Sequence, residues 1–168
     1  MLFRYRYLVS SIGVLLLAGA SFAGENWPNW RGPDQNGVSD AKGLPDSWSE
    51  TEGIVWKTAL PSWSGSSPVI WQDRIFLTSP STSDADPAAT GRSRFVDPGG
   101  ENVLLLCVSK SDGSIRWQRE LDIGNVLGMK GNGASPSPVT DGNHVWTITG
   151  TGAVTAMTLD GDTVWTKN

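Results

Sequence analysis

Short apolar runs separated by glycine-containing turns fill the second half of the chain. The clearest example is residues 135–167, where the turns fall at Asp141-Gly142, at "GTG" (150–152) and at Asp160-Gly161. The four runs between them are residues 137–140, 144–149, 153–159 and 163–167. Asp-Gly and Gly-rich links between β-branched runs are the strongest short-range signal for hairpins. The pattern therefore predicts an antiparallel four-stranded sheet.

The same order of runs occurs once more upstream, within residues 66–121. Its predicted strands are residues 66–71, 74–79, 102–109 and 114–121. Where the later copy has a tight Gly turn, this copy has a polar stretch with Pro and Gly, residues 80–101, which we interpret as an inserted surface loop. The run "NVLLLCVS" (102–109) is apolar almost without alternation, so it must be covered on both faces.

One phrase closes both copies: "SDGSIRW" (111–117) and "LDGDTVW" (159–165), each with Trp four positions after Gly. A looser third match, "GIVWKTAL" (53–60), corresponds to the last strand alone, an orphan strand. The residues of this structural repeat are Trp56, Asp112, Gly113, Trp117, Asp160, Gly161 and Trp165. We interpret the Gly as permitting the turn and the Trp as docking the outer strand on the adjacent unit. Such burial is worth about 4–6 kcal/mol at most; the alternative is a stacking platform for a ligand.

The spacing of the repeat defines the fold class. The three Trp residues are 61 and 48 positions apart, and four-stranded repeats of ~40–50 residues indicate β-propeller blades. We therefore predict an all-β chain: a partial propeller over residues 53–168, with blades at about 66–121 and 135–167 and one orphan strand. Closed propellers have ~4–8 blades, so we expect the N-terminal part of a longer propeller or a truncated gene product.

The N-terminal residues have the pattern of an export signal. Arg4 and Arg6 precede an apolar run, residues 8–20, and "SFAG" then supplies small residues for cleavage after Ala23. This predicts a signal peptide, residues 1–23, and an extension, 24–52; the alternative is a retained membrane anchor. A lipoprotein signal would need Cys where Ala20 stands. We expect an exported, periplasmic or extracellular protein without a lipid anchor.

Composition excludes several kinds of chemistry. The net charge of −4 becomes more negative once the signal is removed, which disfavours nucleic acid and anionic membranes as partners. Cys107 is the only cysteine and lies in an apolar strand, so neither a disulfide nor a reactive thiol is predicted. His144 is the only histidine, which leaves no zinc site or Cys/His pair, and we expect it to be a partly exposed strand residue.

Two further stretches resemble ligand-binding loops but lack residues that such loops require. "GMKGNGAS" (128–135) is Gly-rich but lacks the Lys-Ser/Thr ending of a phosphate loop, so we interpret it as a link between blades. "SDADP" (83–87) places two acids at calcium-like spacing, but the Gly and distal Glu of a calcium loop are missing. Solvated acids in a surface loop are the simpler interpretation.

These motifs resemble the quinoprotein-type (PQQ-like) β-propeller repeat. That repeat has a Ser-Pro-Val start, a turn at Asp-Gly, and a Thr-Gly-x-x-x-Trp ending, which "SPVTDGNHVWTITGTGAVTAMTLDGDTVW" follows with Asp160-Gly161 in place of Thr-Gly. "NWPNWRGPDQNGVS" is also similar to the start of exported proteins of this kind, so the resemblance runs from Asn26 to the end of the chain. The Gly-His and Trp-Asp marks of WD40 repeats are absent.

The resemblance implies one of two functions. Some members are PQQ-dependent dehydrogenases with calcium and a quinone, often under a vicinal Cys pair; others are non-catalytic, such as the scaffold lipoprotein of the outer-membrane assembly machinery. One Cys excludes the pair, and no calcium shell can be matched. We expect a non-enzymatic binding or scaffold module without cofactor, with a protein or small-ligand partner and with self-association through uncovered blade faces. The alternatives are a dehydrogenase fragment, using PQQ and calcium, or a chain without independent function.

Overall fold

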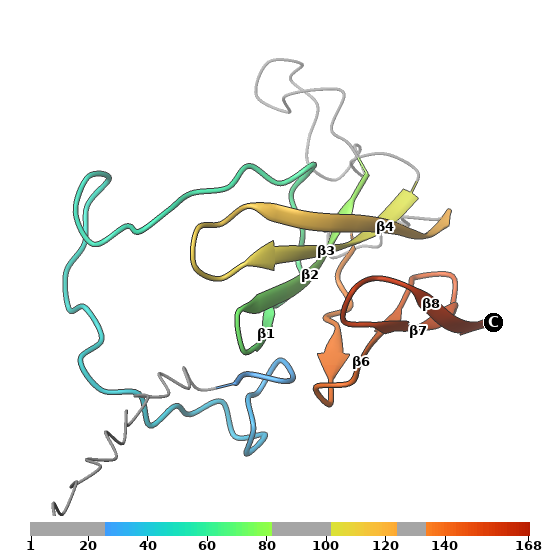
Figure 1. The fold of residues 1–168 in the computed structure, drawn as a ribbon, viewed down its shortest axis with the longest axis horizontal. Helices are drawn as coiled ribbons and strands as arrows, with labels where there is room; N and C mark the ends of the chain where they lie inside the picture. The colour runs from blue at the N-terminus through green and yellow to red at the C-terminus, as the bar shows by residue number, and fades with distance from the viewer. Residues whose placement is uncertain (1–25, 82–101, 124–133) are drawn as a thin grey trace, which may run out of the picture.

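The computed structural model describes residues 26–81, 102–123 and 134–168, which contain eight strands in two antiparallel sheets (Figure 1). Sheet A is β1 (Val69–Trp71), β2 (Arg74–Pro80), β3 (Asn102–Ser109) and β4 (Ile115–Ile123). Sheet B is β5 (Val139–Thr140), β6 (His144–Ile148), β7 (Val154–Thr158) and β8 (Thr163–Lys167). Each strand pairs with its neighbours in sequence, and the described residues contain no helix, so the all-β prediction of four-stranded blades is confirmed.

The predicted strands differ from the observed ones mainly at the first strand of each sheet. β3 and β8 have the predicted bounds, whereas β1 and β5 begin later than predicted, directly after Pro68 and Pro138. Proline has no backbone N–H to donate to a ladder, so the pairing starts after it. β4 extends two residues further, to Ile123, opposite Asn102.

The two sheets pack face to face around one apolar core. Phe76, Leu105 and Cys107 of sheet A meet Val145 and Met157 of sheet B, and all five are buried. Because side chains alternate across a strand, the intervening residues Leu106 and Val108 of β3 point to the opposite face of sheet A. They too are buried there, in a second cluster with Leu77 that includes Trp56. Coverage of β3 on both faces, as its continuous apolar run predicts, is confirmed.

Two Trp–Gly contacts join the sheets at the edge of this core, where Trp71 and Trp117 pack against it. Trp71, at the end of β1, lies against Gly142 in the turn between β5 and β6; a Cβ there would be 2.1 Å from Trp71 Cζ2. Trp117 of β4 lies against Gly161 in the turn between β7 and β8. The hairpin turns of sheet B therefore serve as packing surfaces as well as connections.

The segment 53–60, predicted as an orphan strand, joins no ladder in the described part of the chain. No backbone hydrogen bond joins it to a strand of the described residues. Side chains hold it instead: Trp56 packs on Gly113 and Thr58 donates to the Gly113 carbonyl. Residues 53–60 therefore resemble the last strand of a blade in the position of their Trp, but they do not form a strand.

The N-terminal extension contributes a link that the sequence did not predict. Trp27 exchanges two backbone hydrogen bonds with Ile70 of β1, both 2.8 Å long, and the Pro28 carbonyl accepts one from Thr140 of β5 at 2.9 Å. Two consecutive residues thus bridge the first strands of both sheets. From there the extension runs in a wide arc away from the sheets (Figure 1).

Several predictions concern residues outside those described. They are the signal peptide and its cleavage site, nearly all of the inserted loop with its two acids, and most of the Gly-rich link. In the described residues, no helix is long and apolar enough to cross a membrane.

The Trp71–Gly142 contact can be separated from backbone strain by two alanine substitutions. Gly142 and Gly152 have nearly the same φ, +90° and +93°, but a Cβ at Gly152 meets nothing within 4 Å. We expect Gly152→Ala to cost about 1–2 kcal/mol of unfolding free energy through φ alone. Gly142→Ala should cost about 1–3 kcal/mol more through the clash with Trp71. Urea denaturation measures both, and equal losses would show that the contact carries no energy.

Candidate interaction surface

The possible metal ligands of the described residues, Cys107 and His144 among them, form no reactive cluster. No three His, Cys, Asp or Glu residues in this part of the chain are grouped as a metal site would require. Cys107 is fully buried, and burial raises the pKa of its thiol to about 11. His144 is half-buried at the start of β6, as predicted. The polar features that remain are turns, ion pairs and the exposed faces of the sheets.

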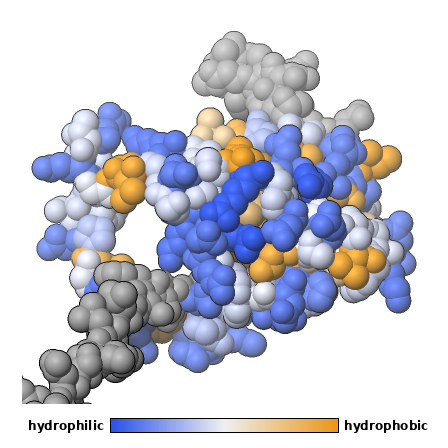
Figure 2. All heavy atoms as spheres, viewed as in Figure 1, coloured by the Kyte–Doolittle hydropathy of each residue, from blue (hydrophilic) through white to orange (hydrophobic). Residues whose placement is uncertain are grey.

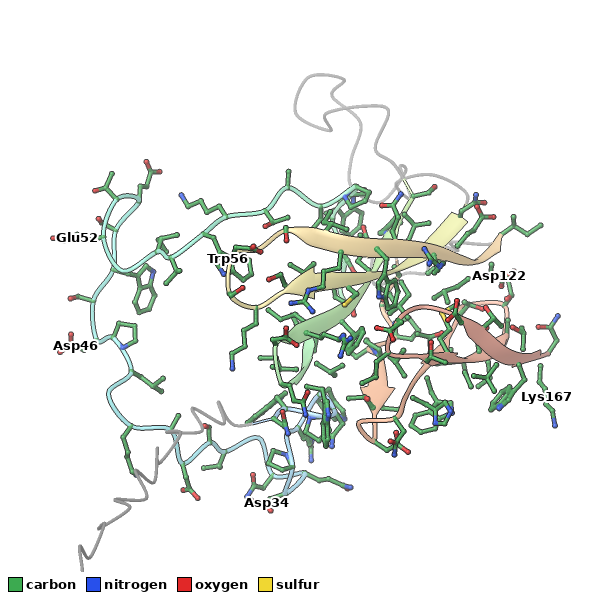
Figure 3. All side chains as sticks on the ribbon, viewed as in Figure 1. Asp34, Asp46, Glu52, Trp56, Asp122 and Lys167 are labelled. Carbon is green, nitrogen blue, oxygen red and sulfur yellow. The ribbon has the colours of Figure 1, made fainter. Side chains whose placement is uncertain are left out.

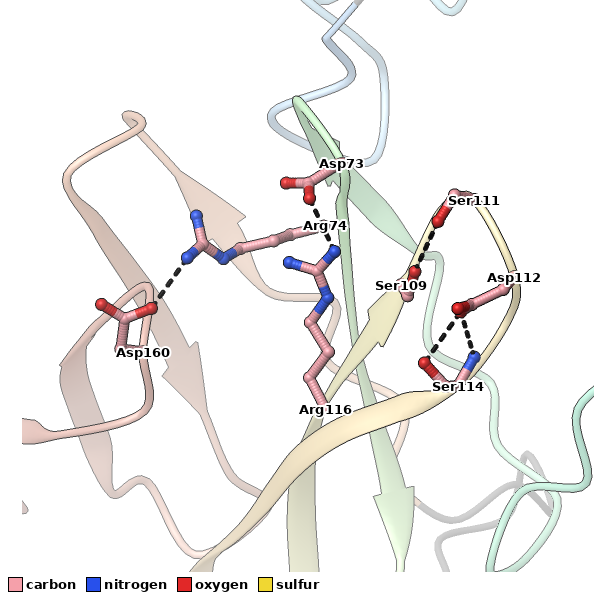
Figure 4. Close-up of polar contacts among 8 residues, drawn as sticks. All are labelled: Asp73, Arg74, Ser109, Ser111, Asp112, Ser114, Arg116 and Asp160. Carbon is pink, nitrogen blue, oxygen red and sulfur yellow. Dashed lines mark hydrogen bonds and ion pairs between the residues drawn. The ribbon is translucent and has the colours of Figure 1, made fainter.

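Three carboxylates near the hairpins, those of Asp73, Asp112 and Asp160, are held by specific partners (Figure 4). Asp112 accepts from the backbone N–H and the hydroxyl of Ser114, at 2.9 and 2.8 Å, and these bonds lower its pKa to about 2. Asp73 pairs with Arg116 at 2.6 Å, and the hydrogen bond from that guanidinium lowers the pKa of Asp73. These acids stabilise turns and remain ionised at neutral pH.

The turn after β7, residues 159–161, is held by β4 of the other sheet; we call it turn B. The indole of Trp117 lies against Gly161, where a Cβ would be 2.9 Å from Trp117 Cδ2. The indole Nε1–H donates to the Leu159 carbonyl at 3.2 Å, and Arg119 Nε donates to the Gly161 carbonyl at 2.9 Å. An ion pair between Arg74 and Asp160, 2.7 Å long, joins the sheets at the same turn (Figure 4).

The turn after β3, residues 110–113, is held in the same way by the segment 53–60; we call it turn A. Trp56 lies against Gly113, its Nε1–H donates to the Lys110 carbonyl at 2.9 Å, and Thr58 Oγ1 donates to the Gly113 carbonyl at 2.5 Å. Figure 3 shows Trp56 beside this turn. In both cases the Trp donates to the first residue after the inner strand, and the residue two positions later donates to the Gly.

β8 carries this donor set a third time, but there it is exposed. Trp165 pairs across the ladder with Ala156, as Trp117 pairs with Cys107, and both outer strands have an irregularity in register just before the Trp. Lys167 stands two residues after Trp165, where Thr58 and Arg119 stand in the other copies. Every residue of β8 is exposed, and within the described residues no carbonyl accepts from Trp165 or Lys167.

The face of sheet B that points away from sheet A is mostly apolar, with His144, Thr158 and Lys167 at its ends; we call it the outer face of sheet B. Val139, Trp146, Ala156 and Trp165 form one cross-strand row, and Ile148, Val154 and Lys167 form the next. The first row corresponds by register to Val69, Phe76, Cys107 and Trp117 of sheet A. The row of sheet A is packed against sheet B. On the outer face of sheet B, by contrast, Val139, Ile148 and Trp165 are 41%, 48% and 40% exposed.

The two ends of the sheet pair therefore differ. The outer side of sheet A is covered, since Leu77, Leu106 and Val108 are buried with Trp56 beside them. Sheet B has no such cover from the described residues, and Figure 2 shows apolar patches among polar side chains where β7 and β8 lie. Figure 3 places Trp56 and Lys167 on opposite sides of the molecule. One end of the sheet pair is capped and the other is open.

The structure brings the repeat residues together in pairs. Trp56 meets Gly113 and Trp117 meets Gly161, while Trp165 stands apart. Asp112 and Asp160, equivalent in sequence, differ in use: the first caps its own turn and the second pairs with Arg74. Sequence reasoning missed the donors two positions after each Trp, although the pattern Trp-x-Thr/Arg/Lys was visible. It also missed Trp71 on Gly142, because that Trp has no counterpart in the second copy.

A comparison with known families fits this arrangement of sheets. Residues 78–168, more than half of the chain, match the model of the PQQ_2 family, described as outer membrane protein assembly factor BamB. The chain belongs to this family of PQQ-like repeats. The match takes in most of sheet A and all of sheet B, so both sheets belong to the PQQ-like repeat region. No curated protein matches the chain.

Trp117 and Trp165 allow the docking contact of a PQQ-like repeat to be measured within one chain. They occupy equivalent positions, but only Trp117 meets a turn. Trp117→Ala should lower the free energy of unfolding by about 3–5 kcal/mol, as for a packed aromatic. Trp165→Ala should cost less, about 1–2 kcal/mol, because Trp165 is 40% exposed and meets no turn in the described residues. Denaturation at low protein concentration tests this, and similar losses at both positions would contradict the asymmetry.

From the burial of Cys107 we predict how its thiol reacts. The native thiol should resist alkylation at pH 8, because it is inaccessible and its pKa of about 11 leaves little thiolate. Mass spectrometry after iodoacetamide treatment should find the native chain unlabelled and the urea-unfolded chain labelled once. Rapid labelling of the native chain would place Cys107 outside the core.

Proposed function

We propose that the chain is an exported, non-enzymatic binding module whose binding surface is the outer face of sheet B. The observation that carries the proposal is the matched row: Val139, Trp146, Ala156 and Trp165 repeat the positions with which sheet A binds sheet B. Exposed apolar residues arranged this way mark interaction sites. The family description, an assembly factor, names a role of the same kind.

The chemistry of the surface favours a β-sheet as the ligand. The row supplies apolar area, Trp165 Nε1–H and the Lys167 ammonium supply two donors, and β8 is an edge strand with unpaired backbone groups along one side. A flat partner with an apolar row and a turn with outward carbonyls satisfies all of these. A small planar ligand could stack on the Trp165 indole but would leave the Lys167 ammonium and the edge of β8 without partners.

Export is part of the proposal and rests on the N-terminal sequence. Arg4, Arg6, the apolar run and the small residues up to Ala23 form the pattern that signal peptidase recognises. The absence of Cys at position 20 leaves no lipidation site there.

Self-association tests the surface without knowledge of a partner. We expect the purified chain to show mass that rises with concentration in size-exclusion chromatography with light scattering, because the outer face of sheet B is apolar. Ile148→Lys places a charge on that face and should reduce the association about tenfold. The control is Ile123→Lys, an exposed isoleucine at the end of β4. Concentration-independent mass, or equal effects of both lysines, would contradict the proposal.

The enzymatic alternative has its own test. We expect no quinone-dependent dehydrogenase activity, since no calcium shell or vicinal Cys pair can be matched in the sequence. The chain is incubated with PQQ and Ca²⁺ and assayed by dye reduction with primary alcohols and aldose sugars. Turnover above that of a heat-denatured sample would favour the dehydrogenase alternative.

A further inference from the structure

We propose that the partner for β8 is turn A of a second copy of the chain, and that Trp56 and Thr58 occupy that turn in competition with it. This inference rests on the proposed function and names the occupant of the binding surface. It implies head-to-tail association, in which the open end of one copy meets the capped end of the next.

The two docked turns define what β8 requires. A suitable turn presents a Gly on which an indole can lie and two carbonyls, one on the first residue after the inner strand and one on the Gly. Among the described residues, turns A and B meet these conditions. Turn B is held within its own chain by strands of sheet A: Trp117 and Arg119 donate to its carbonyls, and Arg74 pairs with Asp160. The two carbonyls of turn A that β8 requires are held by a segment that belongs to no ladder, while the Lys110 N–H donates separately to the Asp73 carbonyl.

The surface around turn A also fits. The outer side of sheet A contains Ile75, Leu77, Leu106 and Val108, on which Trp56 packs, so a second copy must displace the segment of Trp56 from this face as well as from the turn. By register Ile75 and Val108 correspond to Val145 and Met157. Those two residues cover the row that is equivalent to the outer face of sheet B. Docking of sheet B on sheet A of a second copy therefore repeats the contact that already exists within the chain.

Charge complements this fit. Across the existing contact, Arg74 of sheet A pairs with Asp160 of turn B. The residues equivalent by position in the proposed contact are His144 of sheet B and Asp112 of turn A. Lys167 adds a cation to the donor side, at the position from which Thr58 and Arg119 donate to the Gly carbonyl. The donor end thus carries the Lys167 ammonium and the His144 imidazole, and the acceptor turn carries a carboxylate.

Competition with Trp56 sets the strength of association. Trp56 and Thr58 belong to the same chain as turn A, so their local concentration is high and a second copy must displace them. Removing the Trp56 indole frees the turn, which should strengthen head-to-tail association through Trp165. If the turn is mostly occupied in cis, the apparent dissociation constant should fall about tenfold or more.

The experiment uses light scattering on the purified full chain and four variants. Trp56→Ala has a free turn and an intact β8 and should form open-ended oligomers. Trp165→Ala should be the least associated of the single variants. Trp56→Ala/Trp165→Ala has a free turn but no Trp on β8, so it should be monomeric alone and form a 1:1 complex, of twice the monomer mass, with the unsubstituted chain. The matched control is Trp48→Ala, an exposed Trp of the preceding N-terminal extension, which should behave as the unsubstituted chain.

Folding of each variant is checked by circular dichroism and by cooperative unfolding. If Trp56→Ala does not fold, Thr58→Val replaces it, since this change removes one hydrogen bond to turn A and keeps the indole. It should still strengthen association relative to the unsubstituted chain. A synthetic peptide of residues 53–60 should dissociate the oligomers, and the same peptide with Ala at position 56 should not.

The outcomes separate this inference from the proposed function. If Ile148→Lys weakens association but neither Trp56→Ala nor Thr58→Val strengthens it, the outer face of sheet B binds and turn A is not its partner. A 1:1 complex that forms equally when Trp165→Ala replaces the unsubstituted chain would also overturn the inference. If Ile148→Lys has no effect on any association, the proposed function itself fails.

Discussion

The contact between a Trp indole and a glycine-containing turn determines how this molecule is assembled. A side chain on the Gly would occupy the space of the indole, and the indole N–H needs the turn carbonyl once it leaves water. Each half of the contact thus depends on the other. Because every repeat carries a turn before its outer strand and a Trp within it, each unit can accept one neighbour and donate to the next. Direction along the array follows from the order of these two features in the sequence.

Sheet A makes both halves of the contact, whereas Trp165 of sheet B meets no turn among the described residues. Turn A receives Trp56, and β4 delivers Trp117 to turn B. Sheet B receives Trp117 but its own Trp165 contacts solvent. In an array whose stability comes from contacts between neighbours, an uncovered face contributes least to stability. The exposed end of sheet B is therefore both the surface most suited to binding and the part whose packing is least complete.

Much of the fold could be predicted from the sequence because its signals are local. Asp-Gly turns, β-branched runs and a strand apolar on both faces identify the hairpins and the layered packing without knowledge of distant contacts. The interaction surface was only partly predictable. The repeat identified the Trp residues, but which of them lacks a turn depends on the three-dimensional pairing of units. The bridge from Trp27 and Pro28 to both sheets, and the pairing of Trp71 with Gly142, are long-range contacts that no local pattern encodes.

The indole N–H groups report most directly on whether these contacts exist in solution. In a ¹H–¹⁵N correlation spectrum, with resonances assigned by single Trp→Phe substitutions, solvent exchange of each indole proton can be measured in the dilute chain. The account predicts slow exchange for Trp56 and Trp117, whose protons are bonded to the Lys110 and Leu159 carbonyls, and fast exchange for Trp165. Fast exchange at Trp117, or protection of Trp165 equal to that of Trp117 in the monomer, would contradict it.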